Sequence, residues 1–127
     1  MTAQTRLTPS QKRKLVNDII GFLYKHELTG DVIIYADKHA YRFDEYPGYI
    51  LFKHSAGKVW ISEEEVDVET RVEYANPDTI TMTFEGDLYH IINDYPDSKT
   101  ACEFEKIFKR YGLYYEQGYA WSLAAYF

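Results

Sequence analysis

The sequence predicts an α+β fold with an N-terminal helix, a mainly antiparallel sheet of four to six strands, and C-terminal helices. Apolar residues recur at helical spacing near both ends of the chain, whereas the middle is rich in β-branched and aromatic residues that alternate with polar ones. Because the predicted strands are grouped together and do not alternate with helices, we expect antiparallel pairing. A length of 127 residues fits one globular domain over residues 1–127.

The first helix is predicted to begin after Thr8. The run Thr8-Pro9-Ser10-Gln11 has the pattern of a capping box, with proline at the first helical position. Leu15, Ile19 and Leu23 then recur at helical spacing and predict a buried face. Gly30 is the expected stop, because glycine readily adopts the left-handed conformation that commonly follows a helix.

Short strands are predicted over residues 32–36, 41–43, 49–52 and 59–61. Pro47-Gly48 and the loop at residues 54–58 are the turn signals between them. A hairpin is then predicted from residues 66–74 and 79–84, since both runs alternate between apolar and polar positions. Either Tyr74 or Val72 lies opposite Ile80 in this hairpin, and its acidic residues lie beside threonines on a solvent-facing surface.

Two helices are predicted after Gly86. The first is short and covers residues 88–93; the second begins after Asp97 or Ser98 and ends at Gly112. The buried positions predicted for the second helix are Ala101, Phe104, Ile107, Phe108 and Tyr111. Cys102 follows the first of these positions, so we interpret it as a buried small apolar residue rather than a nucleophile. The last fifteen residues are not assigned, although Gln117-Gly118 is a candidate turn between two strands.

The formal net charge is −6, and the charges are unevenly distributed. Arg6 and the run Lys12-Arg13-Lys14 give residues 1–17 four cations and no acid, whereas the remainder is strongly acidic. An acidic body repels phosphates, so direct binding to nucleic acid is not expected. No window reaches the roughly eighteen apolar residues of a membrane span, and the start of the chain does not fit a secretory signal. With one free cysteine, these features favour the cytoplasm.

No catalytic or metal-binding motif is found in the sequence. The glycines are never clustered into a phosphate-binding loop. His26, His39, His54 and His90 are scattered and lack the spacing of metal ligands. His90 and Asp94 lie four apart in a predicted helix and are expected to form a hydrogen-bonded pair. We therefore expect no cofactor and no metal, and we interpret the protein as non-enzymatic.

Carboxylates are concentrated in one stretch, at Glu63, Glu64, Glu65, Asp67, Glu69 and Glu73, with Arg71 as the cation among them. Like charges along a strand repel one another, so these carboxylates do not help the chain to fold. A binding function would explain why they are present. An ordered row of carboxylates resembles nucleic acid phosphates and suits a basic protein groove. The alternative is a solvated sheet face that resists aggregation.

Tyrosine is the other unusual feature, since the chain contains thirteen tyrosines and aromatic residues make up 17% of it. Tyrosine is enriched at interfaces, because it offers apolar area and a hydroxyl group with little loss of entropy. A domain of this size cannot bury all of these rings, and we expect exposed ones in residues 111–127 and 41–49. The C-terminal candidates for partner binding are Tyr114, Tyr115, Tyr119 and Trp121.

Together these features favour a protein–protein interaction module that docks on a partner with a basic surface. A small acidic inhibitor of a nucleic-acid-binding protein is the specific form of this hypothesis. Two alternatives stay open. One is a structural or regulatory homodimer or larger homo-oligomer that uses the aromatic C-terminal segment, and the other is a domain that binds a small molecule.

Overall fold

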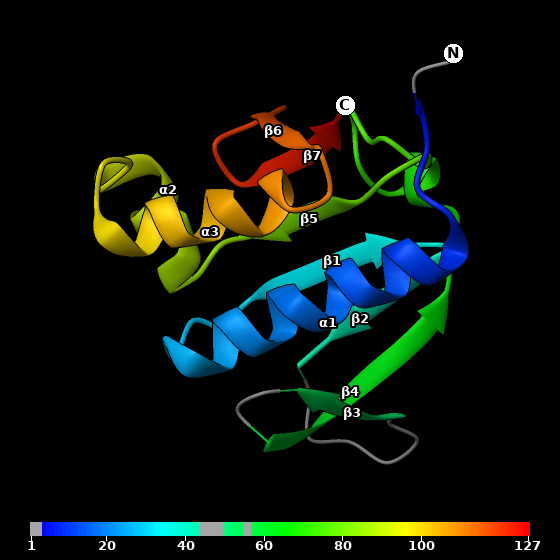
Figure 1. Ribbon diagram of the computed structural model, residues 1–127, viewed down its shortest axis with the longest axis horizontal. Helices are drawn as coiled ribbons and strands as arrows, with labels where there is room; N and C mark the ends of the chain where they lie inside the picture. Colours follow the sequence, from blue (N-terminus) through cyan, green and yellow to red (C-terminus); the bar gives the residue numbers. More distant parts are fainter. Residues whose placement is uncertain (1–3, 44–49, 55–56) are drawn as a thin grey trace.

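The computed structural model describes residues 4–43, 50–54 and 57–127, and only the backbone of residues 50–54 and 57–60. Within these residues the chain forms one seven-stranded antiparallel sheet with the strand order β3-β4-β2-β1-β5-β7-β6 (Figure 1). The expected α+β class is confirmed, with one helix before the strands and two near the C-terminus. The C-terminal segment that the sequence left unassigned supplies two of the strands.

The elements follow one another in this order: α1 (Pro9–Lys25), β1 (Val32–Ala36), β2 (His39–Arg42), β3 (Ile50–His54), β4 (Gly57–Glu65), the short 3₁₀ helix η1 (Val68–Thr70), β5 (Thr81–Phe84), α2 (Asp87–Asp94), α3 (Lys99–Lys109), β6 (Tyr114–Gln117) and β7 (Ser122–Tyr126). The antiparallel pair β3–β4 lies on either side of the predicted loop but extends into it, because His54, Gly57 and Lys58 belong to the paired strands. The predicted turn at Pro47-Gly48 lies outside the described residues.

The main core lies between the sheet and the two long helices, α1 and α3, which cover the same sheet face (Figure 1). Leu15 and Ile19 of α1 and Phe104 and Phe108 of α3 are buried in it. The strands contribute every second residue, among them Ile34 of β1. We call this the helix face of the sheet. Both predicted apolar stripes are therefore confirmed as the surfaces on which the helices pack.

The predicted start of α1 is confirmed, and its predicted end is wrong. Thr8 forms the capping box with Gln11, whose backbone N–H donates to the Thr8 hydroxyl oxygen. The helix ends at Lys25, well before Gly30. Glu27 takes the left-handed conformation with φ +57°, and the next N–H donates to the Leu23 carbonyl. This is a Schellman motif in which glutamate occupies the position where glycine is usual.

The predicted hairpin of residues 66–74 and 79–84 is wrong. The strand β4 ends at Glu65, and the chain then turns through η1 and irregular structure up to residue 80. Strand β5 pairs with β1 and β7 and with nothing in residues 66–74. Neither predicted partner of Ile80 lies opposite it, because the described chain pairs Ile80 with Ala125, whose N–H donates to the Ile80 carbonyl.

The alternating valines of residues 66–72 cover the sheet face that lacks helices, which we call the open face. Val72 is buried there against Tyr35 and Ala40. The backbone of this segment bonds to itself, as in the bond from the Val72 N–H to the Val68 carbonyl. The period-two pattern therefore reflects one buried side of an irregular connection rather than a strand.

Two threonines at and just before the start of β5 are also placed differently from the prediction, since Thr79 and Thr81 are each only 1% exposed. The Thr79 hydroxyl donates to the Ala125 carbonyl at 2.6 Å, and the Thr81 hydroxyl oxygen accepts from the Asn76 N–H at 3.0 Å. A buried hydroxyl needs such a partner. These threonines hold the connection onto the sheet instead of forming a solvent-facing surface.

The predictions for the two C-terminal helices are largely confirmed. Ser98 caps α3, and Gly112 follows it with φ +74°. His90 Nδ1 lies 2.7 Å from a carboxylate oxygen of Asp94 on α2. Cys102 was expected to be buried but is exposed, because it lies one position away from the stripe that packs on the sheet.

One prediction about exposed aromatic residues is wrong for Tyr41, which is 4% exposed in the core beneath α1. Residues 44–49 of the same predicted group lie outside the described residues.

Among the helices that are described, none has both the length and the apolar character needed to cross a lipid bilayer.

Gly30 and Gly86 give a matched test of this fold. A Cβ at Gly86, just before α2, would overlap the Gly30 carbonyl and lie 3.0 Å from its carbon, whereas a Cβ at Gly30 meets nothing within 4 Å. We expect Gly86→Ala to lower the free energy of unfolding by about 1–3 kcal/mol, the range for overpacked sites. Gly30→Ala should change it by no more than about 0.5 kcal/mol. Urea denaturation checks both, and equal effects would contradict the predicted contact.

Candidate partner-binding surface

The six predicted carboxylates do not form a row on one sheet face. Glu63 and Glu64 are neighbours in β4 and point to opposite faces. Glu63 accepts a hydrogen bond of 3.3 Å from the Tyr41 hydroxyl on the helix face. Glu64 accepts one of 3.0 Å from Arg71 and lies 3.6 Å from Arg42. Because these two arginines partly neutralise Glu64, the negative charge around this stretch is smaller than its run of carboxylates indicates.

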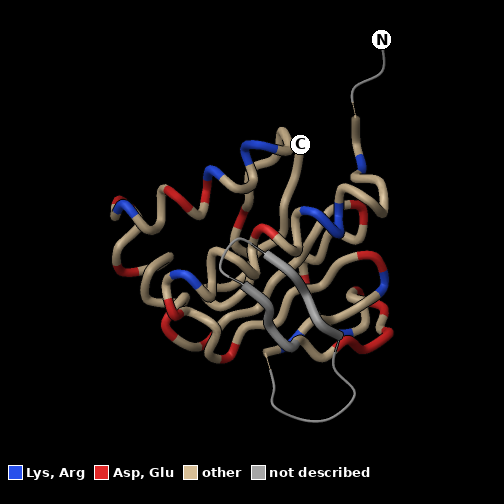
Figure 2. The backbone as a smooth tube through the Cα atoms, turned by 60° about the horizontal axis from the view of Figure 1, so that its bottom comes forward, with Lys and Arg blue, Asp and Glu red and all other residues tan. Residues whose placement is uncertain are grey.

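The remaining acidic residues follow the course of the chain away from the sheet. Asp67 caps η1 by accepting a hydrogen bond of 3.1 Å from the Glu69 N–H. Glu73 lies farther along the connection and accepts a hydrogen bond from the Tyr119 hydroxyl. Acidic positions are scattered over several parts of the chain (Figure 2). The expectation of a continuous phosphate-like row on one face was therefore wrong, because the chain leaves the sheet after Glu65.

Three exposed aromatic residues, Tyr74, Tyr119 and Trp121, gather instead in what we call the aromatic cluster. The rings of Tyr119 and Trp121 are stacked, with centroids 4.9 Å apart and planes at 10°. The Tyr74 ring lies 5.6 Å from that of Tyr119. Their exposed fractions are 65% for Tyr74, 39% for Tyr119 and 38% for Trp121. The predicted residues Tyr119 and Trp121 are thus brought together, and Tyr74 joins them from the connection.

The backbone around the aromatic cluster explains how these residues meet. Tyr74 has φ +62°, a left-handed conformation that is unfavourable for a bulky residue. Gly118 allows its side chain to approach, since a Cβ there would lie 2.9 Å from the Tyr74 ring. The Ser122 hydroxyl oxygen accepts from the Tyr119 N–H at 3.0 Å and shapes the β6–β7 turn. The cluster therefore depends on two segments fitting each other, which no local pattern in the sequence reveals.

Carboxylates flank the aromatic cluster on two sides. Glu73 bonds to Tyr119, which raises the pKa of that tyrosine, the hydrogen bond being the largest cause. Asp31 and Glu85 are exposed and, together with Trp121 and the cation Arg42, line a depression on the open face of the sheet. Their segments are joined by a hydrogen bond of 3.2 Å from the Glu85 N–H to the Asp31 carbonyl. Aromatic faces and carboxylates together favour cationic partners.

The other two predicted tyrosines are placed differently from each other. Tyr114 is half exposed on β6, with its ring 6.0 Å from that of Tyr126. The Tyr115 ring packs against Phe104 and Phe108 at centroid distances of 5.5 and 5.2 Å. Burial raises the pKa of Tyr115 to about 12. Its ring is part of the core margin rather than of a surface.

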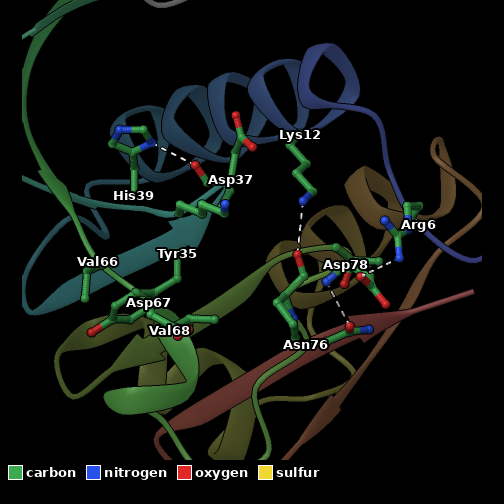
Figure 3. Close-up of a pocket in the computed structure, with 14 residues that line it drawn as sticks. Arg6, Lys12, Tyr35, Asp37, His39, Val66, Asp67, Val68, Asn76 and Asp78 are labelled. Carbon is green, nitrogen blue, oxygen red and sulfur yellow. Dashed lines mark hydrogen bonds and ion pairs between the residues drawn. The ribbon is translucent and has the colours of Figure 1, made fainter.

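A cavity of about 250 Å³ opens at the end of the sheet where the β1–β2 turn meets the connection (Figure 3). Its polar groups largely bind each other. Lys12 donates to the Pro77 carbonyl at 3.0 Å, and Arg6 lies 3.6 Å from Asp78. His39 Nδ1 lies 2.8 Å from the backbone carbonyl oxygen of Asp37. Ligand pockets are usually larger and mainly apolar, so this cavity is a weaker candidate site than the aromatic cluster.

The described residues contain no group of three or more His, Cys, Asp or Glu side chains that could hold a metal ion. Comparison of this chain with protein-family models, curated proteins and solved structures gives no match.

The bond between Glu73 and Tyr119 can be tested by titration. We expect Glu73→Gln to lower the pKa of Tyr119 toward its ordinary value, because the substitution removes the negative acceptor that favours the protonated hydroxyl. NMR of ¹³C-labelled tyrosine measures this titration directly. Glu116→Gln is the matched control on β6 and should leave it unchanged. An unaltered Tyr119 titration in Glu73→Gln would contradict the contact.

Proposed function

We propose that this chain is a non-enzymatic binding protein that docks on a basic surface of a partner protein through its aromatic cluster. The observation that carries this proposal is the contact among three exposed aromatic rings from two separate segments. Tyrosine and tryptophan are the residues most enriched among those that dominate binding energy at interfaces. The main contact is then the aromatic cluster rather than a row of carboxylates along residues 63–73.

The chemistry of the aromatic cluster favours arginine in the partner. A guanidinium group stacks on aromatic faces and also pairs with carboxylates through its planar set of donors. Here the stacked rings of Tyr119 and Trp121 offer aromatic faces, Glu73 bonds to Tyr119, and Asp31 and Glu85 line the depression beside Trp121, which Arg42 also lines. An arginine side chain of the partner can use both kinds of contact at once.

A nucleic-acid-binding protein is the partner class we propose. Such proteins carry clustered arginine and lysine residues in the grooves that contact phosphates. A small acidic chain that occupies such a groove acts as an inhibitor, because it competes with the nucleic acid. The net charge of −6 assists the approach to a basic surface through long-range attraction.

The test is isothermal titration calorimetry with a synthetic oligo-arginine peptide. We expect the double substitution Tyr119→Ala, Trp121→Ala to weaken binding at least about tenfold, since truncated central aromatics typically cost more than 1 kcal/mol each. Tyr24→Ala is the matched control, because Tyr24 lies on α1 with a similar exposed fraction of 37%. Equal affinities in the double variant and the wild type would overturn the proposal.

The two alternative functions predict different results. A homo-oligomer that uses the C-terminal segment shows a dimer or larger mass in light scattering without any peptide. A small-molecule-binding domain shows a raised Tm with a small polar ligand, and substitution of residues that line the cavity of Figure 3 removes the increase. The first result needs no basic peptide, and the second does not depend on Tyr119 or Trp121.

A further inference from the structure

Among the described residues, strand β6 forms one end of the sheet order and pairs only with β7. In antiparallel strands, successive residues direct their N–H and C=O groups to opposite sides. The Ala125 N–H of β7 donates to the Ile80 carbonyl on the side of β5. The neighbouring residues Ala124 and Tyr126 must therefore direct their backbone groups toward β6.

This alternation assigns the backbone groups of β6. Glu116 lies opposite Ala124 and Tyr114 lies opposite Tyr126, so Tyr114 and Glu116 make the bonds to β7. Tyr115 and Gln117 consequently direct their N–H and C=O groups outward, away from the sheet. No group in the described part of the chain pairs with these outward groups. A free edge of this kind is a ready template for another strand.

A hollow of about 170 Å³ lies beside this edge on the helix face. It is lined by Leu113, Tyr114 and Tyr115 around the start of β6 and by Glu105 and Lys109 of α3. Recognition by strand addition typically combines backbone bonds along an edge with pockets for alternate side chains. The outward groups and the hollow supply both features at one place.

The sequence of β6 disfavours a second copy of this chain as the added strand. The register that uses every outward group of both copies pairs Tyr115 with Gln117 of the second copy. That register places Glu116 directly opposite Glu116 of the second copy, where like charges destabilise the pair. A cationic residue at the same position instead forms a favourable cross-strand pair with Glu116. Charge complementarity therefore selects a basic segment.

We propose that the free edge of β6 binds an extended cationic segment of the partner protein as an additional strand of the sheet. This inference rests on the proposed function, because the segment belongs to the same basic partner. Its backbone bonds to Tyr115 and Gln117, and a cationic side chain lies opposite Glu116. The side chains that face the helices enter the hollow beside α3.

The first test is amide hydrogen exchange by NMR with a synthetic peptide of alternating arginine and valine. In the free protein we expect fast exchange at the outward amides of Tyr115 and Gln117 and slow exchange at Tyr114 and Glu116. Saturating peptide should slow exchange at Tyr115 and Gln117 at least about tenfold. The same peptide with alternate backbone amides N-methylated should lose this effect, because it cannot complete the bonds.

A matched pair of substitutions tests the edge from the side of the protein. Gln117→Ala and Gln117→Pro both remove the side chain, but only proline also removes the outward N–H. We expect at least about tenfold weaker peptide binding in Gln117→Pro than in Gln117→Ala. Thermal unfolding of both variants verifies the fold, and the N-methylated peptide decides the question if proline disturbs it.

The outcomes separate this inference from the proposed function. Peptide binding that needs Tyr119 and Trp121 but leaves exchange at Tyr115 and Gln117 unchanged overturns strand addition alone. Slowed exchange with full affinity in the Tyr119→Ala, Trp121→Ala variant supports strand addition and overturns the cluster as the main contact. Absence of binding overturns both. Protection that grows with protein concentration without peptide identifies a second copy as the occupant and overturns the proposed segment.

Discussion

The pairing of β5 with both β1 and β7 is the constraint on which the other features depend. It places β5 on the far side of β1 and β2 from β4, although β4 precedes β5 in the chain. The connection must therefore cross two strands before β5 begins. It does so over the open face, where burial of Val72 against Tyr35 and Ala40 holds it. That crossing brings Glu73 and Tyr74 to the β6–β7 turn.

The parts of the fold that local chemistry determines were predictable from the sequence. The capping box at Thr8, the cap at Ser98 and the left-handed Gly112 each depend on residues within one turn of a helix. The end of α1 was not predictable in this way, because Glu27 adopts a conformation usually reserved for glycine. The false hairpin has a different cause. Alternation shows which side chains are buried but not what covers them, and a crossing connection produces the same alternation as a strand.

The same distinction applies to the candidate site. Tyr119 and Trp121 were predictable as exposed aromatic residues, because they lie in a segment with too many rings to bury. Tyr74 was missed, since its role depends on a left-handed backbone and on the approach permitted by Gly118. The row of carboxylates looked continuous in the sequence only because adjacent positions were assumed to stay in one strand. Their separation after Glu65 follows from the strand order, which pattern analysis does not supply.

Tyr115 links the core to the edge of the sheet. Its ring packs against Phe104 and Phe108, while its backbone N–H and C=O groups point outward, away from β7. The edge is therefore ordered before anything binds, because the packing that fixes the ring also fixes the strand. An incoming segment loses its own conformational entropy but requires almost none from β6. Such preorganisation favours affinity for short segments, and loosening the packing around this ring would weaken binding at the edge without altering any group that faces the ligand.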